Sequence, residues 1–242
     1  MTKALIIVVI ILILYFGVEF GIFYYKYSHL PALPKIDQSD KTLGSGPVLR
    51  YIAAGDSTSV GEGASGFEKS YAYQIAQYLA KTNTVEYRNI GVVGYKTADV
   101  LRNQVDTIIA YKPDVVTISI GPNDATHLVS ANKILANYKA IIEKLESQTL
   151  AKIYITNIAN FYGANILPWL YIYLIEYRDQ KLNQQLTALE DDRVKIVNIH
   201  DFGWNQPPYK NRSKTYAADW FHPNDLGYQN WTAAFLSKIQ AK

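Results

Sequence analysis

The stretch VLRYIAAGDSTSVGEG, residues 48–63, joins an apolar run to a sudden series of glycine, acidic and hydroxyl residues. Its first part, residues 48–54, predicts a buried β-strand, because it is largely apolar and a turn-forming glycine follows it. Ser57 comes directly after this strand, in the order Gly-Asp-Ser. By itself that tripeptide is typical of a polar turn. A functional interpretation of Ser57 therefore depends on what the rest of the chain brings to the same place.

Beyond this strand, short β-branched runs alternate with longer segments of helical pattern. Four further strands are predicted, at residues 84–91, 114–121, 152–158 and 193–199. Helices are predicted at residues 71–81, 97–111, 131–147, 170–190 and 225–240. Ser130 and Asn224 are the expected N-caps of the third and the last of these helices. The alternation predicts an α/β sandwich with a five-stranded parallel sheet and right-handed crossovers.

Polar residues follow three of the predicted strands at the point where each strand ends. Gly-Asp-Ser follows the first, the second runs into NIGVVG and the third into GPND, while DWFH precedes the last helix. Each motif alone is typical of a turn. Ligands of open parallel sheets bind outside the carboxyl ends of the strands. The motifs together therefore predict a functional site at this edge.

Four ordered blocks, GDSTSVGEG, NIGVVGYKT, GPND and DWFHPND, resemble those of the SGNH (GDSL-type) family of serine esterases and lipases. The resemblance extends from residue 48 to the C-terminus. It implies a flavodoxin-like, three-layer α/β/α fold and a catalytic triad of Ser57, His222 and Asp219. It also implies an oxyanion hole made by the backbone amides of Ser57 and Gly94 and the side-chain amide of Asn123. Among such enzymes are carbohydrate esterases, lysophospholipases, thioesterases and small-ester hydrolases.

The chemistry of ester cleavage agrees with these residue types. A serine hydroxyl is a weak nucleophile unless an imidazole within hydrogen-bond reach removes its proton. His222 can take that proton, and Asp219, three residues earlier, can hold the other ring N–H and fix the tautomer. Asn123 offers an N–H donor to the developing oxyanion, and the small Gly94 lets a backbone amide approach it.

Other polar residues at this edge have competing interpretations. His200, followed by Asp201, is an alternative candidate for the base. Asp56 and Asp124 are expected to accept loop N–H bonds that hold Ser57 and Asn123 in place. The four histidines are dispersed without metal-ligand spacing and the chain has no cysteine, so neither a metal nor another cofactor is expected.

The N-terminus carries a long apolar segment, ALIIVVIILILYFGVEFGIFYY, residues 4–25, with Glu19 as its single charge. As a helix it covers roughly 30 Å, the thickness of a bilayer core. A cleaved signal peptide is the alternative, but small residues at a cleavage site are missing. We expect a transmembrane signal-anchor at residues 1–26, an extended linker at 27–47 and a hydrolase domain at 48–242. A short N-terminal tail most simply stays in the cytoplasm, which predicts an extracytoplasmic domain.

The expected function is a membrane-anchored serine hydrolase that cleaves acyl or O-acetyl esters of a lipid, a lysophospholipid or an acetylated carbohydrate. An acyltransferase acting on an envelope glycan with the same serine, or an inactive binding module on the same fold, stays open as an alternative. Nucleic acid is not an expected partner, because 24 basic and 21 acidic residues are spread without long runs of one sign. The apolar segment at residues 164–177 predicts a core helix, or else a flap or membrane-facing surface that favours acyl chains.

Overall fold

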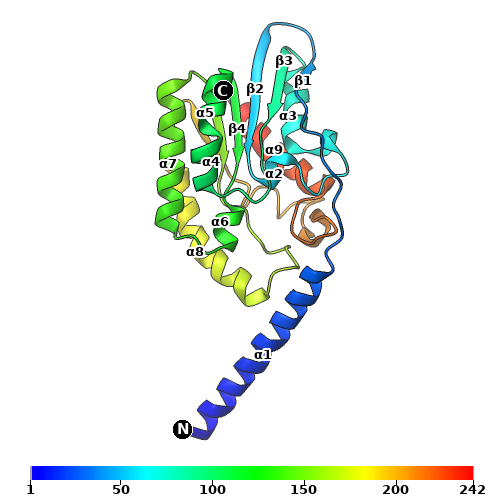
Figure 1. Cartoon of the computed structure of the whole chain (residues 1–242), viewed down its shortest axis with the longest axis vertical. Helices are drawn as coiled ribbons and strands as arrows, with labels where there is room; N and C mark the ends of the chain where they lie inside the picture. Colours follow the sequence, from blue (N-terminus) through cyan, green and yellow to red (C-terminus); the bar gives the residue numbers. More distant parts are fainter. Residues whose placement is uncertain (1, 242) are drawn as a thin grey trace.

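A long helix, α1 (Thr2–Ser28), projects from one end of an α/β domain in the computed structural model, which describes residues 2–241 (Figure 1). The aliphatic side chains along α1 are exposed rather than packed into the domain. Within the described part of the chain, α1 is the helix that is long and apolar enough to cross a membrane. Its 27 residues correspond to about 40 Å of helix.

The sheet has six strands in the order β1-β3-β2-β4-β5-β6. Its five parallel strands are the five predicted ones: β2 (Val48–Gly55), β3 (Thr84–Asn89), β4 (Val115–Ser119), β5 (Lys152–Thr156) and β6 (Val194–Val197). The prediction of a five-stranded, wholly parallel sheet was wrong at one edge, where β1 (Lys41–Leu43) pairs antiparallel with β3. Three residues are too few to show an alternating pattern, and their hydrogen-bond partners lie more than 40 residues further along the chain.

Helices cover both faces of the sheet, which confirms the three-layer α/β/α fold (Figure 1). One face carries α3 (Tyr71–Leu79) and α9 (Asp225–Ile239), which pack against each other. The other carries α4 (Thr97–Asn103), α5 (Val105–Tyr111), α7 (Ala131–Gln148) and α8 (Trp169–Thr187). Four short helices complete the described domain: the α-helices α2 (Ser57–Val60) and α6 (Pro122–Thr126) and the 3-10 helices η1 (Phe67–Lys69) and η2 (Arg212–Thr215).

The single helix predicted at residues 97–111 is instead two helices, α4 and α5, which meet at Gln104. The side chain of Gln104 is buried against the end of β2. Its Oε1 accepts a hydrogen bond from the Gly55 amide at 2.8 Å, and its Nε2 donates to the carbonyls of Gly55 and Ile90 at 2.9 and 2.8 Å. These bonds tie the break between the helices to the strand that leads into Ser57.

Both predicted N-cap residues stand at the N-caps of their helices. Asn224 caps α9 as expected, because its side chain accepts hydrogen bonds from the amides of Leu226 and Gly227. Ser130 is the N-cap residue of α7, as predicted, and its side chain makes no capping hydrogen bond.

The apolar segment at residues 164–177 forms a loop and the first half of α8. Ile172 and Ile175 point inward and belong to the core, in agreement with the predicted core helix. Trp169, Tyr173 and Tyr177, spaced four residues apart, are 66%, 55% and 76% exposed. The helix therefore has a core face and an aromatic outer face.

The chain between α1 and β1 lies against the domain. Ile36 is buried in the core beside α3, and Gln38 donates a hydrogen bond to the Gly91 carbonyl at 3.0 Å. At the end of α1, Lys26 donates to the Asn165 carbonyl and lies 5.8 Å from the ring centre of Trp220. The stretch expected to be an extended linker thus makes specific contacts along the domain.

Candidate active site

Ser57 begins the short helix α2, directly after β2. The preceding Asp56 is its N-cap, with Oδ1 accepting hydrogen bonds from the amide and hydroxyl of Thr58 at 2.8 and 2.6 Å. Gly55 has a φ of +126°, and a Cβ there would lie 1.9 Å from the Ser119 carbonyl oxygen, so this position requires glycine. The Gly-Asp-Ser sequence therefore makes a tight corner that holds Ser57 at the carboxyl edge of the sheet.

Ser57, His222 and Asp219 form one chain of hydrogen bonds. The Ser57 Oγ lies 2.9 Å from Nε2 of His222, and Nδ1 of the same ring lies 2.5 Å from Oδ2 of Asp219. The other carboxylate oxygen of Asp219 accepts the backbone N–H groups of Phe221 and His222, each at 3.1 Å. The last turn before α9 thus orients both the carboxylate and the imidazole toward α2.

The charges around His222 favour its protonated form. Burial alone would lower the pKa of His222, but the hydrogen bond and charge of Asp219, with smaller contributions from Glu62 and Asp56, raise it above the ordinary histidine value. Burial would raise the pKa of Asp219, and the bond to His222 lowers it below the usual aspartate value instead. The pair is therefore suited to stabilise an imidazolium that forms when His222 accepts a proton.

Glu62 is a further charged group at this imidazole that the sequence analysis missed. Its Oε2 lies 3.5 Å from Nε2 of His222 and is buried with no hydrogen-bond partner within residues 2–241. The backbone holds Glu62 firmly, because its amide donates to the Ser57 carbonyl at 3.0 Å and its carbonyl accepts from the Tyr228 hydroxyl at 2.7 Å. The only sequence signal was its place in the GDSTSVGEG block, five residues after the serine.

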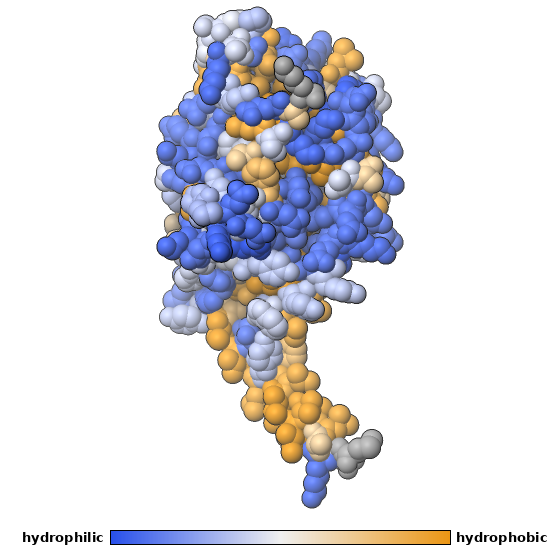
Figure 2. Space-filling model, turned by 180° about the vertical axis from the view of Figure 1, so that it is seen from behind, coloured by the Kyte–Doolittle hydropathy of each residue, from blue (hydrophilic) through white to orange (hydrophobic). Residues whose placement is uncertain are grey.

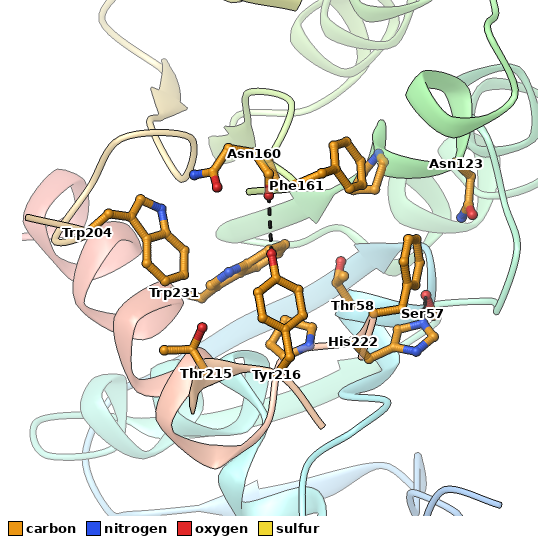
Figure 3. A pocket seen from close by; sticks show the side chains of 14 residues that line it. Ser57, Thr58, Asn123, Asn160, Phe161, Trp204, Thr215, Tyr216, His222 and Trp231 are labelled. Atoms are coloured by element: carbon orange, nitrogen blue, oxygen red, sulfur yellow. Dashed lines mark hydrogen bonds between the residues drawn. The ribbon is translucent and has the colours of Figure 1, made fainter. Parts of the chain in front are cut away.

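Asn123 stands at the start of α6, after Gly121, whose φ is +115°. One N–H of its side-chain amide donates to the Tyr95 carbonyl at 3.0 Å, which leaves the second N–H for another acceptor. Asn123 lines the same pocket as Ser57, as Figure 3 shows. Gly94 lies in an exposed turn with a φ of +81°, and it does not line that pocket.

Asp124, the acidic residue of the GPND block, has a different partner from the one expected. Asp124 was predicted to hold the loop of Asn123, but its two carboxylate oxygens accept the amide and hydroxyl of Thr97 at 2.8 and 2.7 Å. It therefore joins α6 to the beginning of α4. The expectation for Asp56 agrees with the observed bonds to Thr58.

The pocket at Ser57 is small and largely aromatic (Figure 3). Its volume is about 40 Å³. The aromatic side chains that line it are Phe161, Trp204, Tyr216, Phe221 and Trp231. Within residues 2–241, no group of three or more histidine, cysteine, aspartate or glutamate side chains is arranged so that it could hold a metal ion.

His200, the alternative candidate for the base, lies in a separate cluster. Its Nε2 is 2.9 Å from Glu176 and its Nδ1 is 2.7 Å from Asp201, so carboxylates occupy both ring nitrogens. The second carboxylate oxygen of Glu176 accepts the Phe161 amide at 2.6 Å. His200 and Glu176 thus hold a wall of the pocket, and the structure does not bring His200 to Ser57.

Solved structures with the same fold include lipases and carbohydrate esterases. The lipase Lip_vut3 from a goat rumen metagenome superposes with a TM-score of 0.62 at 22% identity, covering 78% of this chain and 96% of that one. The acetylxylan esterase Axe2 from Geobacillus stearothermophilus superposes with a TM-score of 0.59 at 20% identity, covering 83% and 97%.

Sequence comparison supports the same relationship. The spore germination lipase LipC of Bacillus licheniformis is 25% identical over 216 residues, which cover 80% of this chain and 95% of that protein. A sequence model of the GDSL-like lipase/acylhydrolase family matches residues 53–229, a range that includes Ser57, Asn123, Asp219 and His222. The chain therefore belongs to the GDSL-like lipase/acylhydrolase family, a family of ester-hydrolysing enzymes.

Proposed function

We propose that this protein is a membrane-anchored serine hydrolase in which Ser57, His222 and Asp219 cleave an ester through an acyl-serine intermediate. The observation that carries the proposal is the hydrogen-bonded chain from Ser57 Oγ through both nitrogens of His222 to Asp219. A serine with a base at 2.9 Å, oriented in turn by a carboxylate, is the arrangement that activates a hydroxyl for attack on a carbonyl.

In the acylation half of this mechanism, Ser57 Oγ attacks the ester carbonyl carbon while its proton moves to Nε2 of His222. Asp219 stabilises the resulting imidazolium through Nδ1. The carbonyl oxygen becomes an oxyanion, for which the free N–H of Asn123 and the backbone amide of Ser57, both at the pocket, are the proposed donors. The family resemblance adds the backbone amide of Gly94 as a proposed third donor, from a turn outside the lining of that pocket. The carbon–oxygen bond to the alcohol then breaks, and the leaving alkoxide takes the proton from Nε2.

Deacylation repeats these steps with a new acceptor. A water molecule gives its proton to Nε2 and attacks the acyl-serine, and the collapse of the second tetrahedral species returns that proton to Ser57 and releases the acid. A sugar hydroxyl in place of water would make the same protein an acyltransferase. Product analysis therefore separates the two reactions: free acid marks hydrolysis, and a new ester marks transfer.

The proposed substrates are esters of lipids or of acetylated carbohydrates. LipC is described as a lipase and Axe2 as an acetylxylan esterase, so both classes occur among similar proteins. The length and apolar surface of α1 support a membrane anchor. The catalytic domain is proposed to lie on the extracytoplasmic side of that membrane.

A serine-reactive fluorophosphonate tests the proposed nucleophile. We expect the probe to label the wild type and a Ser147→Ala control, which alters an exposed serine on α7, but not Ser57→Ala. Ester hydrolysis by Ser57→Ala should fall by roughly 10⁴-fold or more. Equal labelling and equal hydrolysis in Ser57→Ala would refute the mechanism.

The anchor is tested separately, by fractionating cells and sequencing the mature N-terminus. An anchored protein stays with the membrane and retains residues 1–26. A soluble chain that begins after residue 26 would show that the segment is a cleaved signal peptide.

A further inference from the structure

An apolar groove lies between the anchor helix α1 and the first half of α8. Its volume is about 730 Å³, far larger than the pocket at Ser57. The side chains that line it are aliphatic or aromatic apart from Glu19, Thr126 and His127. From α1 come Phe16, Phe20 and Phe23, and from the opposite wall Ile166, Leu170 and Leu174.

The groove adjoins the pocket at Ser57, because Phe221 lines both. The Phe221 ring stands edge-on to the His222 ring, with 5.1 Å between ring centres, and it stacks on Phe161 at 6.2 Å on the pocket side. His127, at the groove end of α6, donates a hydrogen bond from Nδ1 to the Asn123 carbonyl at 2.8 Å. A molecule lying along the groove therefore has one end beside the catalytic groups.

The groove also has the depth of a lipid leaflet. Its wall on α1 runs from Tyr15 to Tyr27, about 18 Å along the helix axis. Half of a bilayer core is about 15 Å thick. The exposed Trp169 and Tyr173 of α8 stack on each other beside the groove, and such aromatic side chains are typical of a membrane interface. Figure 2 shows the apolar surface of α1 continuing up to the base of the domain.

We infer that this groove holds the fatty acyl chain of a lipid ester that still rests in the membrane, with the ester carbonyl at Ser57. The inference rests on the proposed function and gives its substrate class. A pocket of about 40 Å³ holds the reacting carbonyl but no long chain, so a long chain must leave it along another surface. Passage from lipid into an apolar groove keeps the chain out of water, whereas withdrawal into solution exposes every methylene.

The test uses the full chain reconstituted in phosphatidylcholine vesicles. The substrates are p-nitrophenyl palmitate and p-nitrophenyl acetate, and the measured quantity is the ratio of their kcat/KM values. One variant, Leu174→Asp, places a charge in the groove, and a second, Leu170→Trp, fills it. The matched control is Leu150→Asp, since Leu150 is also exposed, at 94%, but lies before β5 and away from the groove.

We expect the wild type and Leu150→Asp to prefer palmitate, and the palmitate-to-acetate ratio to fall at least 10-fold in both groove variants. A wild-type preference for acetate, or an unchanged ratio in Leu174→Asp and Leu170→Trp, would overturn the acyl-chain assignment. Hydrolysis of p-nitrophenyl acetate that still depends on Ser57 would leave the proposed function in place. Loss of any dependence on Ser57 with both substrates would overturn the proposed function itself.

Discussion

Oε2 of Glu62 lies 3.5 Å from Nε2 of His222, the same nitrogen that faces the Ser57 hydroxyl. The imidazole is therefore placed between two carboxylates, Asp219 at Nδ1 and Glu62 near Nε2. A negative charge at this nitrogen stabilises the imidazolium and so raises the pKa of His222. Because His222 must be neutral to accept the serine proton, activity is lost as the pH falls through that pKa.

Replacing Glu62 should therefore change the pH dependence of the enzyme. In Glu62→Gln we expect the acidic limb of the kcat/KM profile to move to lower pH, because one of the charges that raise the pKa of His222 is gone. The control is Glu68→Gln, an exposed glutamate of η1 in the same segment. An acidic limb that does not move, or that moves to higher pH, would contradict the electrostatic role of Glu62.

Asn123 should contribute to the rate rather than to the fold. Loss of one oxyanion donor typically costs about 10²–10³ in kcat, so we expect a fall of this size in Asn123→Ala with a smaller change in KM. Asn132→Ala, at an exposed position of α7, is the control. A decrease of only a few-fold in kcat would show that Asn123 is not an oxyanion donor.

Gln104 should contribute to stability, because its side chain makes hydrogen bonds to three backbone groups, two on Gly55 at the end of β2 and one on Ile90 just after β3. The Gly55 carbonyl also accepts from the Val92 amide, so Gln104→Ala leaves two groups unpaired, the Gly55 amide and the Ile90 carbonyl. Each buried unpaired group costs about 1–3 kcal/mol, so the free energy of unfolding should fall by roughly 2 kcal/mol or more. Denaturant titration of the detergent-solubilised chain measures the loss. Gln229→Ala, at an exposed site of α9, should change it by less than about 0.5 kcal/mol. Equal free energies of unfolding for the wild type and Gln104→Ala would contradict a stabilising role of the Gln104 hydrogen bonds.

The cluster of His200 and Glu176 should make stability depend on pH. Burial lowers the pKa of His200, but Glu176 and Asp201 together raise it above the ordinary value of about 6.5. A raised folded-state pKa adds stability that is fully present below the unfolded-state pKa and is lost as the pH rises through the folded-state value. Glu176→Gln should therefore destabilise the protein more at pH 6 than at pH 9. The reverse order in denaturant titrations at the two pH values would contradict the ion pair.

Local patterns in the sequence were sufficient for the elements that carry the site. The β-branched runs that became β2 and β4 place Ser57 and Asn123 at the strand ends, and the asparagine that caps α9 fixes the end of the loop that holds His222. These features depend on neighbouring residues, such as a strand followed by a turn, or a cap followed by a helix. Interactions between residues that are close in sequence determine these features, so local sequence patterns are enough to predict them.

The features that escaped prediction depend on contacts between distant parts of the chain. In the sequence Gln104 has the pattern of an ordinary helical residue, because its hydrogen-bond partner Gly55, the last residue of β2, lies 49 residues earlier. Glu176 contacts His200, which lies 24 residues later in the sequence, and Glu62 contacts His222, which lies 160 residues later. No local periodicity encodes such pairs, because packing of whole elements brings them together.

The contacts of the segment after α1 have a further consequence for a protein anchored as proposed. With Ile36 buried, Gln38 bound to Gly91 and Lys26 bound to Asn165, the catalytic domain is not suspended on a free tether. Ser57 is then held at a nearly constant height above the plane where α1 leaves the lipid. An enzyme anchored as proposed would search for substrate in two dimensions, among ester groups close to the membrane surface.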